Sequence, residues 1–240
     1  MTDWSVFNNR YFGFAPVLFK PMLKKVIRIL MARKADPEKK DNIICAAIPV
    51  FARKGYAATR IIDVARSAGI GKGTVYEYFS SKEDLFFSVF QQIMQDSETQ
   101  MAEAAASNSG SVAGRLKIMA DVLITTWLEK LELYSLVMEF WSATTASVSR
   151  ERFKSAFQAG YQAFREAIAD LIREGIDRGE FSRACRPVAV ASGFIGMCDA
   201  LLLQAWLDET FDALGSSRAC MDVMLRGLST LQDEEPTCID

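Results

Sequence analysis

No histidine occurs among the 240 residues of the sequence. This absence removes the side chain that most often acts as a general base near neutral pH and as a nitrogen ligand of metals. Ser-His and Cys-His nucleophilic pairs are excluded for the same reason. Carboxylate or lysine chemistry is not excluded, but no such residues cluster in a plausible constellation. We therefore expect no catalytic residues, no metal site and no cofactor, and an all-α enzyme is the least favoured function.

Signals for β-structure are also scarce. Proline occurs six times, no Asn-Gly or Asp-Gly hairpin dipeptide is present, and no segment alternates apolar and polar residues. Half of the residues are hydrophobic, which is enough to form a substantial core in a chain of this length. We predict an all-α protein of about nine helices.

The cysteines form no Cys-x-x-Cys pair, and no secretion signal is evident. We therefore expect reduced thiols in a cytoplasmic protein, where most of them serve as small core hydrophobes. A thiol-based redox switch is the alternative. The five residues are Cys45, Cys185, Cys198, Cys220 and Cys238.

The most informative segment, residues 61–80, has the pattern of two short helices joined by a tight turn. Ala65 is small enough for the helices to cross closely, and Gly69 tolerates the positive φ that the turn requires. Val75 lies on the inner face of the second helix. The combination is typical of a helix-turn-helix motif. A helical hairpin in an unrelated all-α protein is the alternative.

The outward residues of the second helix combine a cation, a glycine that permits close approach, a hydroxyl and two phenols. Such groups contact phosphates and base edges when the N-terminus of a helix enters the major groove of DNA. The predicted DNA-binding residues are Thr59, Arg60, Lys72, Gly73, Thr74, Tyr76, Tyr78 and Lys82.

The surroundings of the motif are specific. Asn42-Ile-Ile-Cys-Ala-Ala and Val50-Phe-Ala-Arg-Lys-Gly-Tyr56 precede it, and Tyr76-Glu-Tyr-Phe-Ser-Ser-Lys-Glu-Asp-Leu-Phe86 overlaps and follows its end. In these residues the chain resembles the TetR family of transcriptional regulators. The resemblance implies an N-terminal three-helix DNA-binding domain. It also implies a long fourth helix and a C-terminal helical bundle that binds a small effector and forms a two-fold dimer.

Several local features before the motif have physical reasons. Gly55 is expected to end the first helix of the domain, and Thr59 to cap the helix that follows and to meet a phosphate. Pro49 lies inside the first helix and removes an amide donor, so we expect a kink or a rearranged turn there.

The start of the fourth helix breaks one local rule. Ser81 and Asp84 form a weak version of a capping box. Lys82, in the first turn, is unfavourable for the helix dipole. A phosphate contact would explain this lysine.

Charge supports a division of the chain into an extension (1–36), a DNA-binding domain (37–97) and an effector-binding and dimerisation domain (98–235). Residues 31–90 carry 10 basic and 7 acidic side chains, whereas residues 91–240 carry 13 and 22. Positive charge is therefore concentrated where the DNA surface is predicted.

The first 30 residues carry 5 basic and 1 acidic side chain, together with several aromatic residues. Their longest uncharged run, Tyr11 to Phe19, is too short to span a membrane. We expect a loosely ordered extension, or a protein that begins at Met31. A basic arm that reaches the minor groove is the alternative.

Beyond the fourth helix, large apolar residues recur at helical spacing, which usually indicates a core. In this protein some of them could instead line an apolar effector cavity, because large, adaptable side chains shape pockets. The predicted cavity residues are Trp127, Tyr134, Met138, Trp141, Phe157, Tyr161 and Phe194.

The segment from Pro187 to Leu207 is apolar almost all round, with Asp199 as its only charge. Its length would permit a membrane span, but the aspartate in the middle and the DNA-binding domain favour a helix covered by the bundle and a second subunit. The predicted dimer interface consists of Gly193, Gly196, Ala200, Met221, Met224, Leu225 and Leu228.

These features predict a homodimeric regulator that binds a palindromic operator in double-stranded DNA, without a membrane partner. From the resemblance we expect a repressor released by an unknown small apolar or amphipathic effector. The alternative is a DNA-binding regulator without a small-molecule switch, such as an activator or a protein-controlled regulator.

Overall fold

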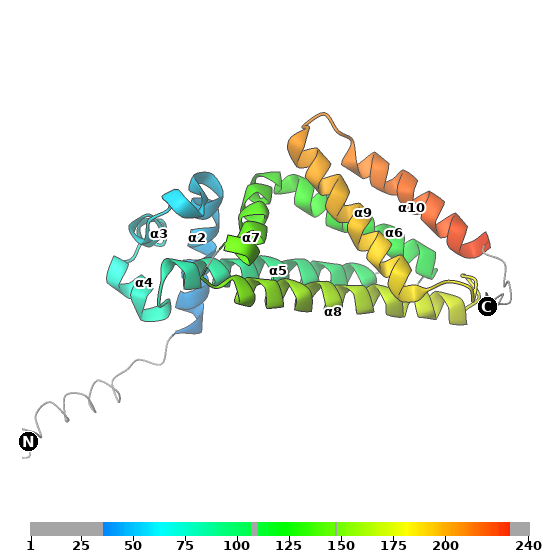
Figure 1. Ribbon diagram of the computed structural model, residues 1–240, viewed down its shortest axis with the longest axis horizontal. Helices are drawn as coiled ribbons and strands as arrows, with labels where there is room; N and C mark the ends of the chain where they lie inside the picture. Colours follow the sequence, from blue (N-terminus) through cyan, green and yellow to red (C-terminus); the bar gives the residue numbers. More distant parts are fainter. Residues whose placement is uncertain (1–35, 107–109, 147, 231–240) are drawn as a thin grey trace, which may run out of the picture. The chain divides into compact units, whose positions relative to one another are not determined.

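The computed structural model describes residues 36–106, 110–146 and 148–230. In these ranges the protein forms nine α-helices, one short 3-10 helix and no strand, which confirms the all-α prediction. The elements are α2 (Pro37–Ala58), α3 (Ile61–Ser67), α4 (Lys72–Tyr78), α5 (Lys82–Ala106), α6 (Val112–Glu129), η1 (Leu131–Leu133), α7 (Tyr134–Ala146), α8 (Arg150–Asp177), α9 (Pro187–Leu207) and α10 (Ala213–Thr230) (Figure 1).

The chain separates into two compact units, Met1–Asn42 and Ile43–Asp240. The described residues of the first unit are 36–42, of which 37–42 form the beginning of α2. Residues 1–35 of the predicted N-terminal extension and Cys238 lie outside the described residues. All contacts discussed below lie within the second unit.

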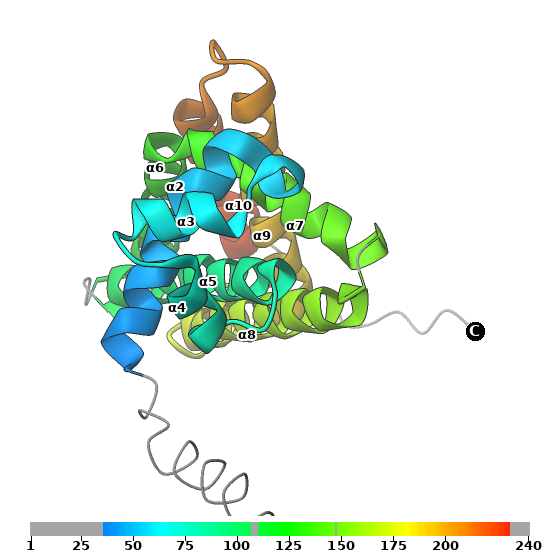
Figure 2. The ribbon, with the colours of Figure 1, turned by 90° about the vertical axis from the view of Figure 1, so that its left-hand side faces the viewer.

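Two clusters of buried side chains form the core of the second unit. One cluster joins α2, α3 and α4 to the first half of α5, to α7 and to the start of α8. The other joins the second half of α5 to α6, α8, α9 and α10. The long helices α5 and α8 therefore contribute to both clusters, and the two views of the ribbon show them side by side (Figures 1 and 2).

The first helix of the motif region departs from the expectation about Pro49. The non-helical backbone of α2 lies at Gly55, with φ 73° and ψ 164°, and not at the proline. The expected rearranged turn at Pro49 is therefore wrong. Glycine tolerates the positive φ that would strain other residues, so the change of direction lies there.

Helix α9 is long and apolar enough to cross a membrane by length and composition, and 39% of its apolar 18-residue stretch is buried in the protein. Part of this helix packs into the second core cluster through Ala191, Phe194 and Leu202. A core helix of a globular protein passes the same composition test, so the feature alone does not indicate a membrane span.

Candidate nucleic-acid interface

The helix-turn-helix geometry is built by three small or apolar residues. Ala65 on α3 and Val75 on α4 are fully buried, at 0% exposure each, where the two helices pack together. Gly69 adopts φ 66° in the turn. A side chain with a Cβ would be strained in this conformation. These residues orient α4 and leave its other face open to solvent.

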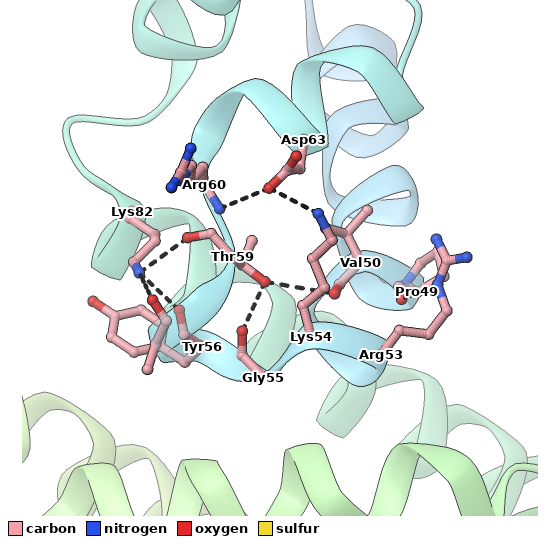
Figure 3. Close-up of polar contacts among 11 residues, drawn as sticks. Pro49, Val50, Arg53, Lys54, Gly55, Tyr56, Thr59, Arg60, Asp63 and Lys82 are labelled. Carbon is pink, nitrogen blue, oxygen red and sulfur yellow. Dashed lines mark hydrogen bonds and ion pairs between the residues drawn. The ribbon is translucent and has the colours of Figure 1, made fainter.

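The start of α3 is capped by an aspartate rather than by Thr59. The amide of Arg60 donates to Asp63 Oδ2 at 3.1 Å, and Lys54 forms an ion pair with the same oxygen at 3.1 Å (Figure 3). The backbone hydrogen bond to Asp63 and the bond from Lys54 hold the pKa of this carboxyl below its usual value. Lys54 therefore ties the end of α2 to α3.

Thr59 has a different role from the one expected. It is 1% exposed, and its hydroxyl donates to the carbonyl of Gly55 at 2.7 Å (Figure 3). Its predicted role as the cap of α3 is therefore wrong. The buried hydroxyl satisfies a carbonyl at the bend of α2 and is not presented for a phosphate.

Lys82 also differs from the expectation of an outward phosphate contact. Its Nζ donates to the carbonyls of Tyr56 at 2.7 Å, Thr59 at 3.1 Å and Ala57 at 3.2 Å (Figure 3). The same atom lies 4.3 Å from the centre of the Tyr56 ring, which adds a cation–π contact. The cation compensates the carbonyl end of α2, so its unfavourable place at the start of α5 has a structural reason.

The start of α5 is capped partly as expected. The amide of Asp84 donates to Ser81 Oγ at 3.0 Å. The return bond of the capping box goes one residue further, because Asp84 Oδ2 accepts from the amide of Ser80 at 3.0 Å. Burial raises the pKa of Asp84, but hydrogen bonds from Ser80 and Arg152 outweigh it and leave the pKa lowered. Arg152 links this turn to α8.

The outward face of α4 carries most of the predicted DNA contacts. Lys72, Gly73 and Tyr76 are exposed, Tyr76 by 48%, and Lys72 Nζ lies 5.7 Å from the centre of the Tyr76 ring. Thr74 is half-buried, and Tyr78 packs partly against the first core cluster. Arg60 is exposed at the start of α3. The geometry thus groups a cation, a hydroxyl and a phenol on one short helix.

A contact that the sequence did not reveal joins α7 to the bend of α2. Glu139 Oε2 accepts a hydrogen bond from the amide of Tyr56 at 2.8 Å. A Cβ added at Gly55 would lie 2.8 Å from Glu139 Oε1, so a larger residue there would require this carboxylate to shift. The partners are 83 residues apart in the chain, and no local pattern pairs them.

A cavity of about 150 Å³ lies among α5, α6, α7, α8 and α9. Five of the seven predicted residues line it: Trp127, Tyr134, Trp141, Phe157 and Tyr161. Met138 and Phe194 are not among its lining residues and pack in the second core cluster, so their predicted place is wrong. Both have the same apolar character as lining residues, and helical spacing alone cannot distinguish a cavity wall from a core.

Asp199 is the polar centre of this cavity. Its Oδ2 accepts a hydrogen bond from Tyr161 at 2.7 Å, and its carbonyl accepts one from Tyr134 at 3.4 Å. Burial raises the pKa of Asp199, and the bond from Tyr161 opposes that shift. Burial and the nearby aspartate also raise the pKa of Tyr134 to about 12. The sequence signal for this site was the single charge in an apolar helix.

The residues predicted for a dimer interface divide into two groups. Gly193, Gly196 and Ala200 are exposed on one face of α9. The α10 residues face mostly the other way: Met221, Leu225 and Leu228 are 1%, 6% and 6% exposed and belong to the second core cluster, with Met224 packed against it. The predicted place of Met221, Leu225 and Leu228 at the dimer interface is therefore wrong, because the subunit itself buries these side chains, whereas Met224 is half-buried.

Two family models match the chain. The model described as "Bacterial regulatory proteins, tetR family" matches residues 43–89, and "BetI-type transcriptional repressor, C-terminal" matches residues 113–228. The chain is 30% identical to YfiR, an uncharacterized HTH-type transcriptional regulator of Bacillus subtilis (strain 168). That match covers 75% of this chain and 88% of YfiR.

Two solved structures with bound ligands share the fold. FadR of Bacillus subtilis in complex with stearoyl-CoA matches with a TM-score of 0.64 and 21% identity, over 78% of this chain and 97% of FadR. A regulator of Saccharomonospora viridis in complex with choline matches with a TM-score of 0.67 and 21% identity, over 80% of this chain and 97% of that regulator.

Proposed function

Since the chain belongs to the TetR family of DNA-binding transcriptional regulators, we propose that it is a homodimeric, cytoplasmic repressor that leaves a palindromic operator when a small molecule occupies the cavity beside Asp199. The family models and the YfiR match establish the coarser function. The proposed parts are the residues that contact DNA, the two-fold assembly and the response to an effector. The division near residue 97 between a DNA-binding and an effector-binding domain belongs to the same proposal.

The observation that carries the proposal is the exposed face of α4. Lys72, Thr74 and Tyr76 share one short helix whose other face is fixed by buried Val75. A helix held in this way can enter the major groove without rearrangement, and a dimer presents two such helices to a palindrome. Selection of bound fragments from the native genome with purified protein tests this function directly. The absence of any preference over random competitor DNA would contradict it.

Replacement of Lys72 by alanine and replacement of Tyr76 by alanine are expected to change DNA binding in different ways. Lys72→Ala removes a phosphate-positioning charge, so affinity should fall for all sequences and the salt dependence should flatten by about one unit. Tyr76→Ala should relax preference at particular base pairs, with a cost of about 1–3 kcal/mol there. Fluorescence anisotropy with the selected operator and point-mutated operators, across a salt series, measures both effects.

Lys82→Met is the matched control for these variants. It removes a charge close to the interface, but that charge is held by three backbone carbonyls. Hydrogen bonds to a charged group contribute roughly 1.5–3 kcal/mol, so urea unfolding should show a loss of that order. If Lys72→Ala and Tyr76→Ala produced the same pattern, or if Lys82→Met matched Lys72→Ala in salt dependence at unchanged stability, this assignment would be wrong.

Helix α7 is the element best placed to couple the cavity to the DNA-binding helices. Its Tyr134 and Trp141 line the cavity, while Glu139 binds the amide at the bend of α2. A hydrogen bond joins the starts of α5 and α8 in the same region, because Glu83 Oε1 accepts from the amide of Ser149 at 3.0 Å. A ligand that shifts α7 therefore displaces a contact of the DNA-binding helices, and differential binding to the two arrangements provides the coupling.

Glu139→Ala is expected to reduce the response to an effector without removing the cavity. The substitution removes the acceptor of the Tyr56 amide, so a movement of α7 is no longer transmitted to the bend of α2 through this hydrogen bond. Ligand affinity should stay within about threefold, while the ligand-induced change in operator affinity should shrink from the range of about 5–150-fold typical of allosteric coupling. Calorimetry gives the first quantity and anisotropy with and without ligand gives the second.

Glu139→Gln retains an acceptor at the same position and is the control for that change. It should keep most of the coupling that Glu139→Ala loses. A screen by thermal shift supplies the ligand, because a molecule that binds only the folded state raises the melting temperature. If Glu139→Ala kept the full response to such a ligand, transmission through α7 and Tyr56 would be refuted.

A further inference from the structure

The lining of the effector cavity has an unbalanced charge. Its residues include the carboxylates of Asp199 and Glu98 but no lysine or arginine. Among the residues that the structure describes, Asp199 forms no ion pair, and its carboxylate is held by the hydroxyl of Tyr161. A carboxylate placed in an apolar wall without a cation is costly unless something compensates it.

The rest of the wall consists mainly of aromatic and aliphatic side chains. The aromatic residues are Trp127, Tyr134, Trp141, Phe157, Tyr161 and Phe164. The faces of aromatic rings attract organic cations, and quaternary ammonium groups are recognised by several such rings together. An acyl carboxylate or phosphate would instead meet two carboxylates and find no basic partner in this wall.

We propose that the effector of this protein is an organic cation, with an ammonium group held beside Asp199 among these aromatic rings and an apolar body along the rest of the cavity. The inference rests on the proposed effector role of the cavity and specifies its ligand class. Asp199 supplies the compensating charge, and Tyr161 fixes the carboxylate in place. Glu98, exposed on α5, adds a second negative charge at the wall.

The ionisation of Asp199 predicts that the affinity for a cation depends on pH. Burial raises the pKa of Asp199, so its proton is retained to a higher pH than usual, and a bound cation favours release of that proton. The other polar groups of the wall are Ser97 and Glu98 from α5, Tyr134 from α7, Tyr161 from α8 and Cys198 beside Asp199 on α9. Helix α6 contributes Leu123 and Trp127. Cation affinity should therefore rise with pH through the raised pKa of Asp199.

The test compares three probes by isothermal titration calorimetry. Phenyltrimethylammonium and tert-butylbenzene have nearly the same shape and differ in charge, and decanoate represents an acyl anion. We expect the cation to bind at least tenfold more tightly than the hydrocarbon and decanoate to bind most weakly. Asp199→Asn should cost the cation at least tenfold in affinity and leave the hydrocarbon within about threefold.

Two controls keep the result interpretable. Glu103→Gln removes an exposed carboxylate of α5 that is not part of the wall, and it should leave all three affinities unchanged. The pH series on the unmodified protein needs no variant, so it decides the question even if Asp199→Asn does not fold. Cation affinity that is flat with pH, equal affinity for the hydrocarbon, tighter binding of decanoate, or no binding of any probe would overturn the inference.

The operator-binding assay separates this inference from the proposed function. If decanoate binds and releases the DNA while the cation does not bind, the ligand class is wrong and the ligand-released regulator stands. If the cation binds through Asp199 but operator affinity does not change, the cationic site stands and release by this ligand fails. Each outcome therefore affects one of the two proposals.

Discussion

Gly196→Arg is expected to disrupt the proposed homodimer, leave the protein monomeric and lower operator affinity by about 100-fold or more. Gly196 is exposed on α9, and a Cβ built there meets nothing within 4 Å in the isolated subunit. An arginine therefore fits the subunit, and in a helix it has a better intrinsic propensity than glycine. A charged, long side chain does not fit where two helices approach closely.

The reason for choosing this position is the pattern of the exposed face of α9. Exposed small or apolar residues occur alternately four and three residues apart, which is the spacing of a helix–helix seam. They are Ala189, Gly193, Gly196, Ala200, Leu203 and Leu207. Two linked DNA-binding modules bind with an avidity roughly 10²–10⁴ higher than the affinity of a single module, so a monomer loses most of its affinity for a palindrome. Sedimentation velocity and anisotropy measure the two effects.

Ala159→Arg is the control for added charge and bulk, because Ala159 is exposed on α8 away from this face. It should remain dimeric and bind the operator. Circular dichroism should show the same helix content for both variants. A Gly196→Arg protein that sediments as a dimer and binds the operator normally would rule out α9 as the interface.

The parts of the fold that depend on nearby residues could be predicted from the sequence. The positive φ of Gly69, the cap from Ser81 to Asp84, and the start of α9 at Pro187 all follow from local steric and hydrogen-bonding rules. Such rules act within a few residues. They therefore apply before any tertiary contact is known.

The roles of Thr59 and Lys82 could not be predicted in the same way. The carbonyls that Lys82 binds are 23–26 residues away in the chain, and the hydroxyl of Thr59 turns back to Gly55. An exposed-looking cation beside a DNA-binding motif suggests a phosphate contact. The three-dimensional contact reveals a bond that holds the domain together.

The sequence also could not predict which face of α10 is buried within the subunit. Helix α10 has an apolar row, Met221, Leu225 and Leu228, which the subunit buries, and a separate exposed side that includes Ala219 and Val223, the latter 65% exposed. Periodicity identifies an apolar stripe but not the partner that covers it. Only the packing of the subunit shows which residues remain for a second copy.

Phe140→Ala is expected to destabilise the protein by about 3–5 kcal/mol, the usual range for truncating a buried phenylalanine. Phe140 is 0% exposed, and its ring centre lies 4.7 Å from that of Phe86 and 5.2 Å from that of Phe90. The truncation leaves a cavity between α7 and α5 that close-packed neighbours can fill only in part. Urea unfolding measures the loss.

Trp141→Ala is the matched comparison, because the next residue of the same helix is 47% exposed. The larger side chain should cost less, about 1–2 kcal/mol, since half of it never leaves water. The two neighbours thereby separate two contacts of α7: Phe140 packs the helix into the first core cluster, and Trp141 lines the cavity. Equal losses of stability would contradict this division. A large loss from Phe140→Ala alone would show that α7, which lines the cavity, depends for its stability on packing in the first core cluster.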